Sequence, residues 1–187
     1  HFPAFHQLPC DYDLDMCYYS DTGSAAMHWC FSVKIKTKLL WFRPMYRVKD
    51  RAGLEYLVAF HLDDRLCFLD IYEKCKEGFT MCIMYTNQHL FVDGQQGIHV
   101  EVESTVKVLP CILQKLMKTG DKLKENNGCC TVTSMKCSKC KMCYCSKKCQ
   151  LKDWNGRHKV ECRVAQQILK WGEFDWDQFD NFQVFEI

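Results

Sequence analysis

A run of closely spaced cysteines in the second half of the chain constrains its fold more than any other feature. Eight of the fifteen cysteines lie between Cys129 and Cys162. Five of these cysteines and one histidine have the spacing of metal ligands: Cys137, Cys140, Cys145, Cys149, His158 and Cys162. Cys143 lies among them, and the adjacent pair Cys129 and Cys130 precedes them. Two thiolates separated by two residues can bind one tetrahedral ion from a tight turn, and ligands four positions apart share one face of a helix. The spacing therefore predicts a zinc-binding module.

A disulfide framework is the other explanation for a cysteine-rich segment. Such frameworks are typical of short secreted chains that cannot build a core, whereas this chain has 187 residues, of which 48% are hydrophobic. The cysteine total is odd, and the cysteines outside the cluster are scattered singly. We therefore expect reduced thiols and a reducing compartment, the cytoplasm or the nucleus.

The overall charge and hydropathy argue against two other classes of protein. The net charge is +2 and the sequence pI is about 7.9, so the composition as a whole does not indicate a polyanion binder. No apolar run reaches the roughly 18 residues that a membrane helix needs, so no membrane partner is expected.

Residues 29–124 carry the pattern of a β-rich domain that ends in a helix. The segment 31–39 alternates apolar with charged or polar residues, as a half-buried strand does. Further short apolar runs are separated by turn residues such as Gly53, which predicts about five or six strands. Short, evenly spaced strands favour a small antiparallel β-barrel or sandwich. Apolar residues then recur with helical spacing over 111–124, so we expect an α+β fold with a helix after the sheet.

Three further segments are expected around this domain. Residues 1–28 show no clear periodicity and predict an irregular arm. A polar break at 125–128 precedes the zinc module, which we assign to residues 126–163. Residues 164–187 predict a helical segment and an aromatic-acidic tail. We expect this tail to fold back onto the β-rich domain or onto the zinc module, although exposed aromatic residues would also suit a docking peptide.

The cysteine cluster resembles the MYND-type zinc finger. The last six ligand positions of that family match Cys137, Cys140, Cys145, Cys149, His158 and Cys162 one by one. The text from Cys149 to Trp154 is also similar to the CQxxDW of the family. The resemblance implies two zinc ions held in interleaved fashion and a C-terminal finger with short helices. One site would use Cys137, Cys140, His158 and Cys162, and the other Cys145 and Cys149 with a leading pair.

The leading pair departs from the family pattern. The usual gap before Cys137 makes Cys129 the second ligand and puts the first on Asn126, whose neutral amide binds zinc poorly. Either Cys130 or Cys143 completes this site, or the site is weak or empty. We therefore expect one complete zinc site and a second one with an irregular first ligand.

The zinc is expected to be structural, and the protein is expected not to be an enzyme. A closed four-ligand site leaves no position for water or substrate. MYND fingers are known mainly as protein-interaction modules that bind short proline-containing peptides, and the resemblance implies that Gln150 and Trp154 would supply the groove. The alternative for Trp154 is packing against the core of its own finger. We expect an adaptor or regulatory protein that recognises partner peptides.

Nucleic-acid binding by a transcriptional regulator is the second function considered. The finger is basic, with Lys136, Lys139, Lys141, Lys147, Lys148, Lys152, Arg157, Lys159 and Arg163 against Asp153 and Glu161. Such lysines are more often simply solvated.

A remnant of a methyltransferase-type enzyme is the third function considered. Methyltransferases that carry a MYND finger need an Asn-His-x-Cys motif and glycine-rich loops, which this chain lacks. Segments 48–64, 85–103 and 106–116, together with the tail, resemble fungal MYND proteins that have an N-terminal β-domain, a likeness that implies architecture and no activity.

Overall fold

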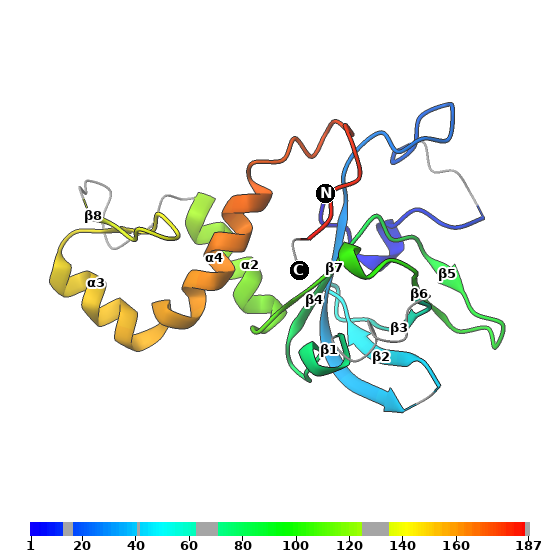
Figure 1. Cartoon of the computed structure of the whole chain (residues 1–187), viewed down its shortest axis with the longest axis horizontal. Coiled ribbons are helices and arrows are strands. Elements are labelled where there is room, and N and C mark those ends of the chain that lie inside the picture. Colours follow the sequence, from blue (N-terminus) through cyan, green and yellow to red (C-terminus); the bar gives the residue numbers. More distant parts are fainter. Residues whose placement is uncertain (13–16, 41, 63–70, 125–134, 186–187) are drawn as a thin grey trace. The chain divides into compact units, whose positions relative to one another are not determined.

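The chain forms two compact units in a computed structural model that describes all residues except 13–16, 41, 63–70, 125–134 and 186–187 (Figure 1). One unit comprises His1–Leu113 together with Asp175–Ile187, and the other comprises Gln114–Phe174. These limits differ from the expected ranges at two points. The helix expected at the end of the β-rich domain is grouped with the zinc module, and the end of the expected tail is grouped with the sheet.

A seven-stranded sheet builds the first unit. Its elements are η1 (Phe5–Gln7), β1 (Cys30–Leu40), β2 (Pro44–Lys49), β3 (Glu55–Phe60), β4 (Thr80–Met84), β5 (His89–Leu90), β6 (Gln96–Val100), η2 (Glu103–Thr105) and β7 (Val106–Leu109). The strand order is β5-β6-β3-β2-β1-β4-β7. All neighbours are antiparallel except β3 and β6, which are parallel. The expectation of a wholly antiparallel sheet was therefore wrong. Among the described residues no strand pair closes the sheet into a barrel.

Strand β1 joins the two halves of this sheet. It pairs with β4 through Cys30–Lys34 and with β2 through Lys34–Leu40, with an irregular register between Ile35 and Thr37. An irregularity of this kind bends a strand and increases its twist. A single long strand can therefore serve two neighbours over different parts of its length.

The predicted alternation of β1 is confirmed by the core of the first unit. Phe31, Val33 and Ile35 are fully buried, whereas Ser32 and Lys34 between them are half-buried and Lys36 is exposed. Residues of the expected irregular arm also enter this core, because Phe5 is buried and its ring stacks on that of Tyr56 with centroids 3.7 Å apart. The arm therefore contributes to the apolar packing of the sheet.

The second unit is small and mostly helical. Its elements are α2 (Leu113–Lys124), β8 (Met135–Lys136), β9 (Cys143–Tyr144), α3 (Lys147–Asp153), the π-helical turn η3 (Trp154–His158) and α4 (Lys159–Trp171). Strands β8 and β9 form an antiparallel pair. Helix α3 begins after Ser146, whose hydroxyl accepts a hydrogen bond from the Cys149 N–H at 3.2 Å. Within the described part of the chain, no helix is long and apolar enough to span a bilayer.

Gly97 allows β6 to approach its neighbours closely. A Cβ atom at this position would lie 2.2 Å from the Leu57 carbonyl oxygen and 2.8 Å from the Phe91 ring. We predict that Gly97→Ala lowers the free energy of unfolding by about 1–3 kcal/mol, since the backbone of β3 cannot move without cost. Urea denaturation of the first unit measures this change. Gly156→Ala is the control, because no atom lies within 4 Å of its added Cβ. If Gly156→Ala lowered the free energy of unfolding as much as Gly97→Ala, the steric explanation would be wrong.

Three histidines lie together at one end of this sheet. The ring centroid of His99 is 3.9 Å from that of His61 and 5.1 Å from that of His89. Burial is the main cause that lowers the pKa of His61, and the His99 ring, the Arg43 guanidinium and the His89 ring lower it further. Burial also lowers the pKa of His99, against the opposing effect of Glu101. The folded unit therefore favours the neutral forms of His61 and His99.

The stability of the first unit should fall in mild acid. Because both pKa values lie below the ordinary histidine value of about 6.5, the unfolded chain binds more protons, and stability is lost as the pH drops below that value. We expect a lower urea midpoint at about pH 5.5 than at about pH 7.5, and a smaller difference in His99→Gln. The exposed His6 provides the control, and an equal effect of His6→Gln would refute the assignment to this cluster.

Candidate metal centre

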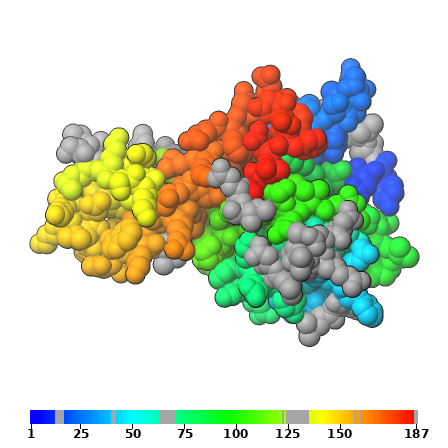
Figure 2. All heavy atoms as spheres, viewed as in Figure 1, coloured from blue at the N-terminus to red at the C-terminus, as the bar shows by residue number. Residues whose placement is uncertain are grey.

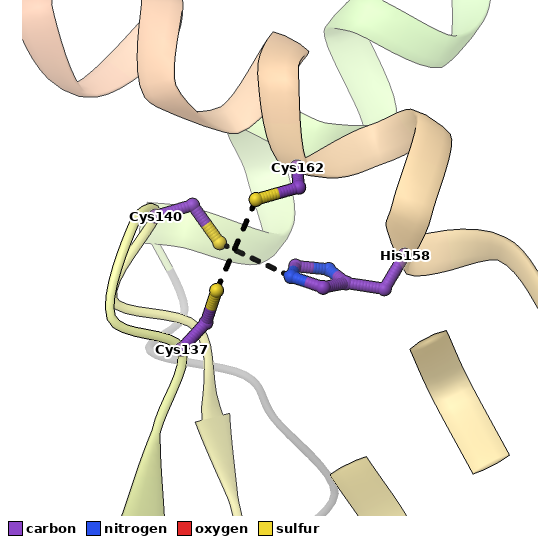
Figure 3. A group of neighbouring side chains, drawn as sticks. All are labelled: Cys137, Cys140, His158 and Cys162. Carbon is purple, nitrogen blue, oxygen red and sulfur yellow. Dashed lines mark hydrogen bonds between the residues drawn. The ribbon is translucent and has the colours of Figure 1, made fainter. Parts of the chain in front are cut away.

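Four side chains of the second unit converge on one point. Cys137, Cys140, His158 and Cys162 are buried, and their ligand atoms all lie within 4.8 Å of one another (Figure 3). The Sγ atoms of Cys137 and Cys162 are 3.8 Å apart, and Cys140 Sγ is 3.3 Å from His158 Nε2. Tetrahedral zinc with ordinary Zn–S bonds of about 2.3 Å places two thiolates about 3.8 Å apart. The donor set and its spacing therefore fit zinc.

A tight turn between β8 and β9 presents the first two ligands. The Cys137 N–H donates to the Met142 carbonyl at 2.8 Å, and the Lys141 N–H donates to the Cys137 carbonyl at 3.0 Å. Lys141 has a φ of 59° in the left-handed region. That conformation is unfavourable for a lysine by about 1–2 kcal/mol, so the hydrogen bonds of the turn must offset this cost. The Cys-x2-Cys spacing predicted such a turn.

The other two ligands come from the helical segment. His158 ends the π-helical turn η3, and Cys162 lies four residues later on α4, so both side chains face the same side. A π-helical turn adds a residue to one helical turn and often occurs at functional sites. Here it separates α3 from α4 and sets the direction of His158.

The thiols need a cation before all of them can ionise. Burial raises the pKa of Cys137, but the Cys140 N–H, His158 and the Lys139 N–H outweigh it, and the pKa falls to about 6. Burial and the neighbouring thiols raise the pKa of Cys140 to about 12. Burial and Cys137 likewise raise the pKa of Cys162. A divalent ion removes this conflict, because ligation stabilises every thiolate at once.

Asp153, Tyr144 and Gln166 surround the ligands and were not identified as site residues from the sequence. Asp153 Oδ2 lies 3.9 Å from His158 Nδ1 and accepts a hydrogen bond from the Tyr144 hydroxyl at 2.8 Å. Gln166 Nε2 lies 3.5 Å from Cys162 Sγ. A carboxylate behind a histidine ligand orients the ring and raises its basicity. The only sequence signal was that Asp153 belongs to the CQxxDW text.

The other expected ligands that the structure describes are not brought into this group. Cys129 and Cys130 lie outside the described residues, as does Asn126. Cys143, Cys145 and Cys149 lie in or next to β9 and α3, and Cys145 is exposed while the other two are half-buried. A second zinc ion and its ligands therefore remain a prediction.

The expected peptide-binding residues lie directly beside the centre. Gln150 is half-buried on α3, and Trp154 is 39% exposed at the start of η3. The Trp154 ring lies 5.8 Å from the ring of the ligand His158, tilted by 56°. The indole thus touches the finger and still presents part of its surface. Glu161, one of the two acidic residues of the basic finger, is buried, and its Oε1 lies 3.8 Å from Lys115 Nζ.

We predict that Asp153→Asn weakens zinc binding about tenfold or more, because it removes the charge that supports His158. Competition with a chromophoric chelator measures the affinity. Glu173→Gln is the matched control, since it neutralises an exposed carboxylate of the same unit. Equal affinities of the two variants would show that Asp153 does not act on the metal centre.

Comparison with known proteins identifies a family for the finger, residues 126–162, and for no other part of the chain. Residues 126–162 match the family model described as the MYND finger. No curated protein matches the sequence, so the expected likeness of the front half to fungal MYND proteins stays a prediction.

Several solved structures are weakly similar to the chain. A chain of a replication protein A heterotrimer bound to ssDNA has a TM-score of 0.31 and 14% identity, over 43% of this chain and 57% of that one. A chain of the Schizosaccharomyces pombe Stn1–Ten1 complex has a TM-score of 0.36 and 10% identity, over 80% and 81%. Pot1pC of Schizosaccharomyces pombe bound to ssDNA has a TM-score of 0.39 and 8% identity, over 59% of this chain and 87% of that one. Similarities this low establish neither a fold nor a ligand. The firm result is that residues 126–162 carry a MYND-type zinc finger.

Proposed function

We propose that this chain is a zinc-dependent, non-enzymatic adaptor or regulatory protein whose finger binds short proline-containing peptides. The observation that carries the proposal is the partly exposed Trp154 ring, which packs beside a zinc ligand. Zinc and the binding surface are thereby linked, because the ion fixes His158 and His158 supports the indole. Metal binding would then act on function through the shape of this surface.

The surface around Trp154 has the chemistry that such a peptide needs. Leu151 is 52% exposed one helical turn before Trp154, so the two residues form an apolar patch. Gln150 lies next to them and its amide can bond a peptide backbone. Proline restricts a peptide before it binds, so docking on an aromatic wall costs little entropy. These features support peptide recognition at α3 and η3.

The geometry of the ligands supports a structural role for the metal. Four protein ligands leave no open position for a water molecule or a substrate. The thiolates also need a reducing environment to stay available, which supports the cytoplasm or the nucleus. We therefore retain the non-enzymatic assignment as part of the proposal.

A second candidate, single-stranded nucleic acid, is favoured by the topology of the first unit. Its strands run in the order β4-β1-β2-β3-β6, with the single parallel pair between β3 and β6. This strand order would suit an OB-fold, a five-stranded, partly open barrel that binds oligonucleotides near the loop between its first two strands. Phe42 lies in that loop and is fully exposed, and exposed aromatic rings can stack on bases.

We predict that Trp154→Ala keeps its zinc and loses peptide binding by about tenfold or more, as expected for a central aromatic contact. An array of proline-containing peptides, each paired with its proline-to-alanine counterpart, supplies the ligands. Lys159→Ala, an exposed change on α4, should bind normally. Cys162→Ser should lose both zinc and peptide while the first unit stays folded.

The same proteins decide between the two candidates. Preference for the proline peptides that disappears in Trp154→Ala supports the adaptor. Binding of single-stranded oligonucleotides that survives Trp154→Ala and weakens in Phe42→Ala would support the second candidate. If Trp154→Ala bound every peptide as well as the unchanged protein, the proposed groove would be wrong.

A further inference from the structure

The end of the chain forms an extended segment that lies on the first unit. Between Asp175 and Phe185 it contains no helix or strand. Three aromatic residues, Trp176, Phe179 and Phe182, follow one another at intervals of three, and Asp177 and Asp180 each follow an aromatic residue. Figure 2 shows this segment (red) at the surface, and Figure 1 shows it near the amino terminus.

Backbone hydrogen bonds hold this segment at several points. The Trp176 carbonyl accepts from the His28 N–H, and the Phe179 N–H donates to the Ala26 carbonyl, both at 3.0 Å. Further along, the Gln183 N–H donates to the Tyr85 hydroxyl at 2.9 Å. Bonds to the main chain fix the path of a peptide independently of its side chains, as in other modes of peptide recognition.

The aromatic rings supply side-chain contacts at matching intervals. Trp176 lies 4.8 Å from the Phe2 ring, Phe179 lies 5.3 Å from His28, and Phe182 lies 5.1 Å from Tyr85. Ring pairs at these separations stabilise a contact beyond the area they bury. We call the surface formed by Phe2, Ala26, His28 and Tyr85 the tail groove.

A buried histidine gives the groove its preference for acid. His28 is 2% exposed, its Nδ1 lies 2.6 Å from the Tyr85 hydroxyl, and its Nε2 lies 3.4 Å from Asp180 Oδ1. Since that hydroxyl accepts the Gln183 N–H, its own proton is best directed at Nδ1, which leaves Nε2–H to donate to Asp180. The groove therefore presents a donor at the position that a carboxylate occupies.

Most of the segment is held shallowly, whereas its end is anchored by Phe185, which is buried and donates its N–H to the Ser104 carbonyl at 2.8 Å. Phe182 is 63% exposed and Val184 is 56% exposed, and the carboxylates of Asp177 and Asp180 are largely in solvent. Segments with few buried contacts and no regular hydrogen-bond ladder are the first to open in a folded protein. The stretch from Trp176 to Val184 can thus leave the groove without unfolding the sheet.

Release of the tail would also uncover a cavity. A space of about 410 Å³ lies beside the ends of β4 and β6, and Phe182 and Val184 form part of its wall. Ile83, Met84 and Val100 provide apolar lining from the strands. An incoming peptide would therefore gain apolar surface that the tail fills incompletely.

We propose that the tail groove is a second peptide-binding site, which recognises acidic partner peptides with aromatic residues three positions apart. The tail is its intramolecular occupant and competes with such partners. This site is independent of the proposed peptide surface at Trp154, since its residues belong to the first unit and to the segment after residue 174.

The test uses the full chain with zinc bound. Phe179→Ala combined with Phe182→Ala loosens the tail without changing the groove. A fluorescent peptide of residues 174–185 is then titrated, and anisotropy measures binding. We expect the loosened protein to bind it at least about tenfold more tightly than the unchanged protein, whose own tail competes at high effective concentration. Gln178→Ala, an exposed change in the tail, should behave like the unchanged protein.

Changes in the peptide and in the groove test the recognition itself. A peptide with Asp180→Asn should bind a few-fold more weakly, and one with Gln178→Ala should bind normally. Tyr85→Phe added to the loosened protein should weaken binding, because it removes the hydroxyl that Gln183 and His28 share. This variant retains the ring, so the fold is preserved, and circular dichroism checks it.

Three results would overturn the proposal. The first is a folded loosened protein that does not bind the peptide. The second is equal binding of a peptide with the same composition in scrambled order, which would indicate attraction by charge alone. The third is self-association of the loosened protein through exchanged tails without uptake of the peptide, which would make a second copy the occupant.

Discussion

The mutual repulsion that three thiolates would have in a space a few ångströms wide is the constraint on which the second unit depends. Cys137, Cys140 and Cys162 cannot all be thiolates there without a cation, as the opposite pKa shifts of Cys137 and Cys140 show. A small module buries too little apolar surface to fold alone, so metal binding supplies part of its folding free energy. The ion would fix His158 and Cys162 against the turn between β8 and β9, and with His158 the support of the Trp154 ring.

The ligands could be predicted because zinc binding here rests on local geometry. Two ligands with two residues between them, such as Cys137 and Cys140, need a turn. Two ligands with three residues between them, such as His158 and Cys162, need a helix, and both spacings can be read from the sequence. Asp153 could not be predicted in the same way. Its approach to His158 depends on the π-helical turn between them, and a regular helix would have turned the two side chains to other angles.

The sheet shows the same division between local and distant information. The alternation along β1 identified its buried face correctly, because a strand repeats every two residues. The parallel pairing of β3 with β6 joins segments far apart in the chain, and no local pattern records it. The tail was expected to fold onto either the β-rich domain or the zinc module. Its hydrogen bonds to Ala26 and His28 show that it packs on the β-rich domain.

The course of the chain makes the second unit an insertion into the first. The chain leaves the sheet at Leu113 and returns to it at Asp175, so every contact of the tail closes a loop that contains the whole finger. Closing a loop costs more entropy when the loop is long and flexible than when it is short or ordered. A metal-loaded finger shortens the flexible part of that loop. The ion would thereby favour attachment of the tail to the sheet through chain entropy.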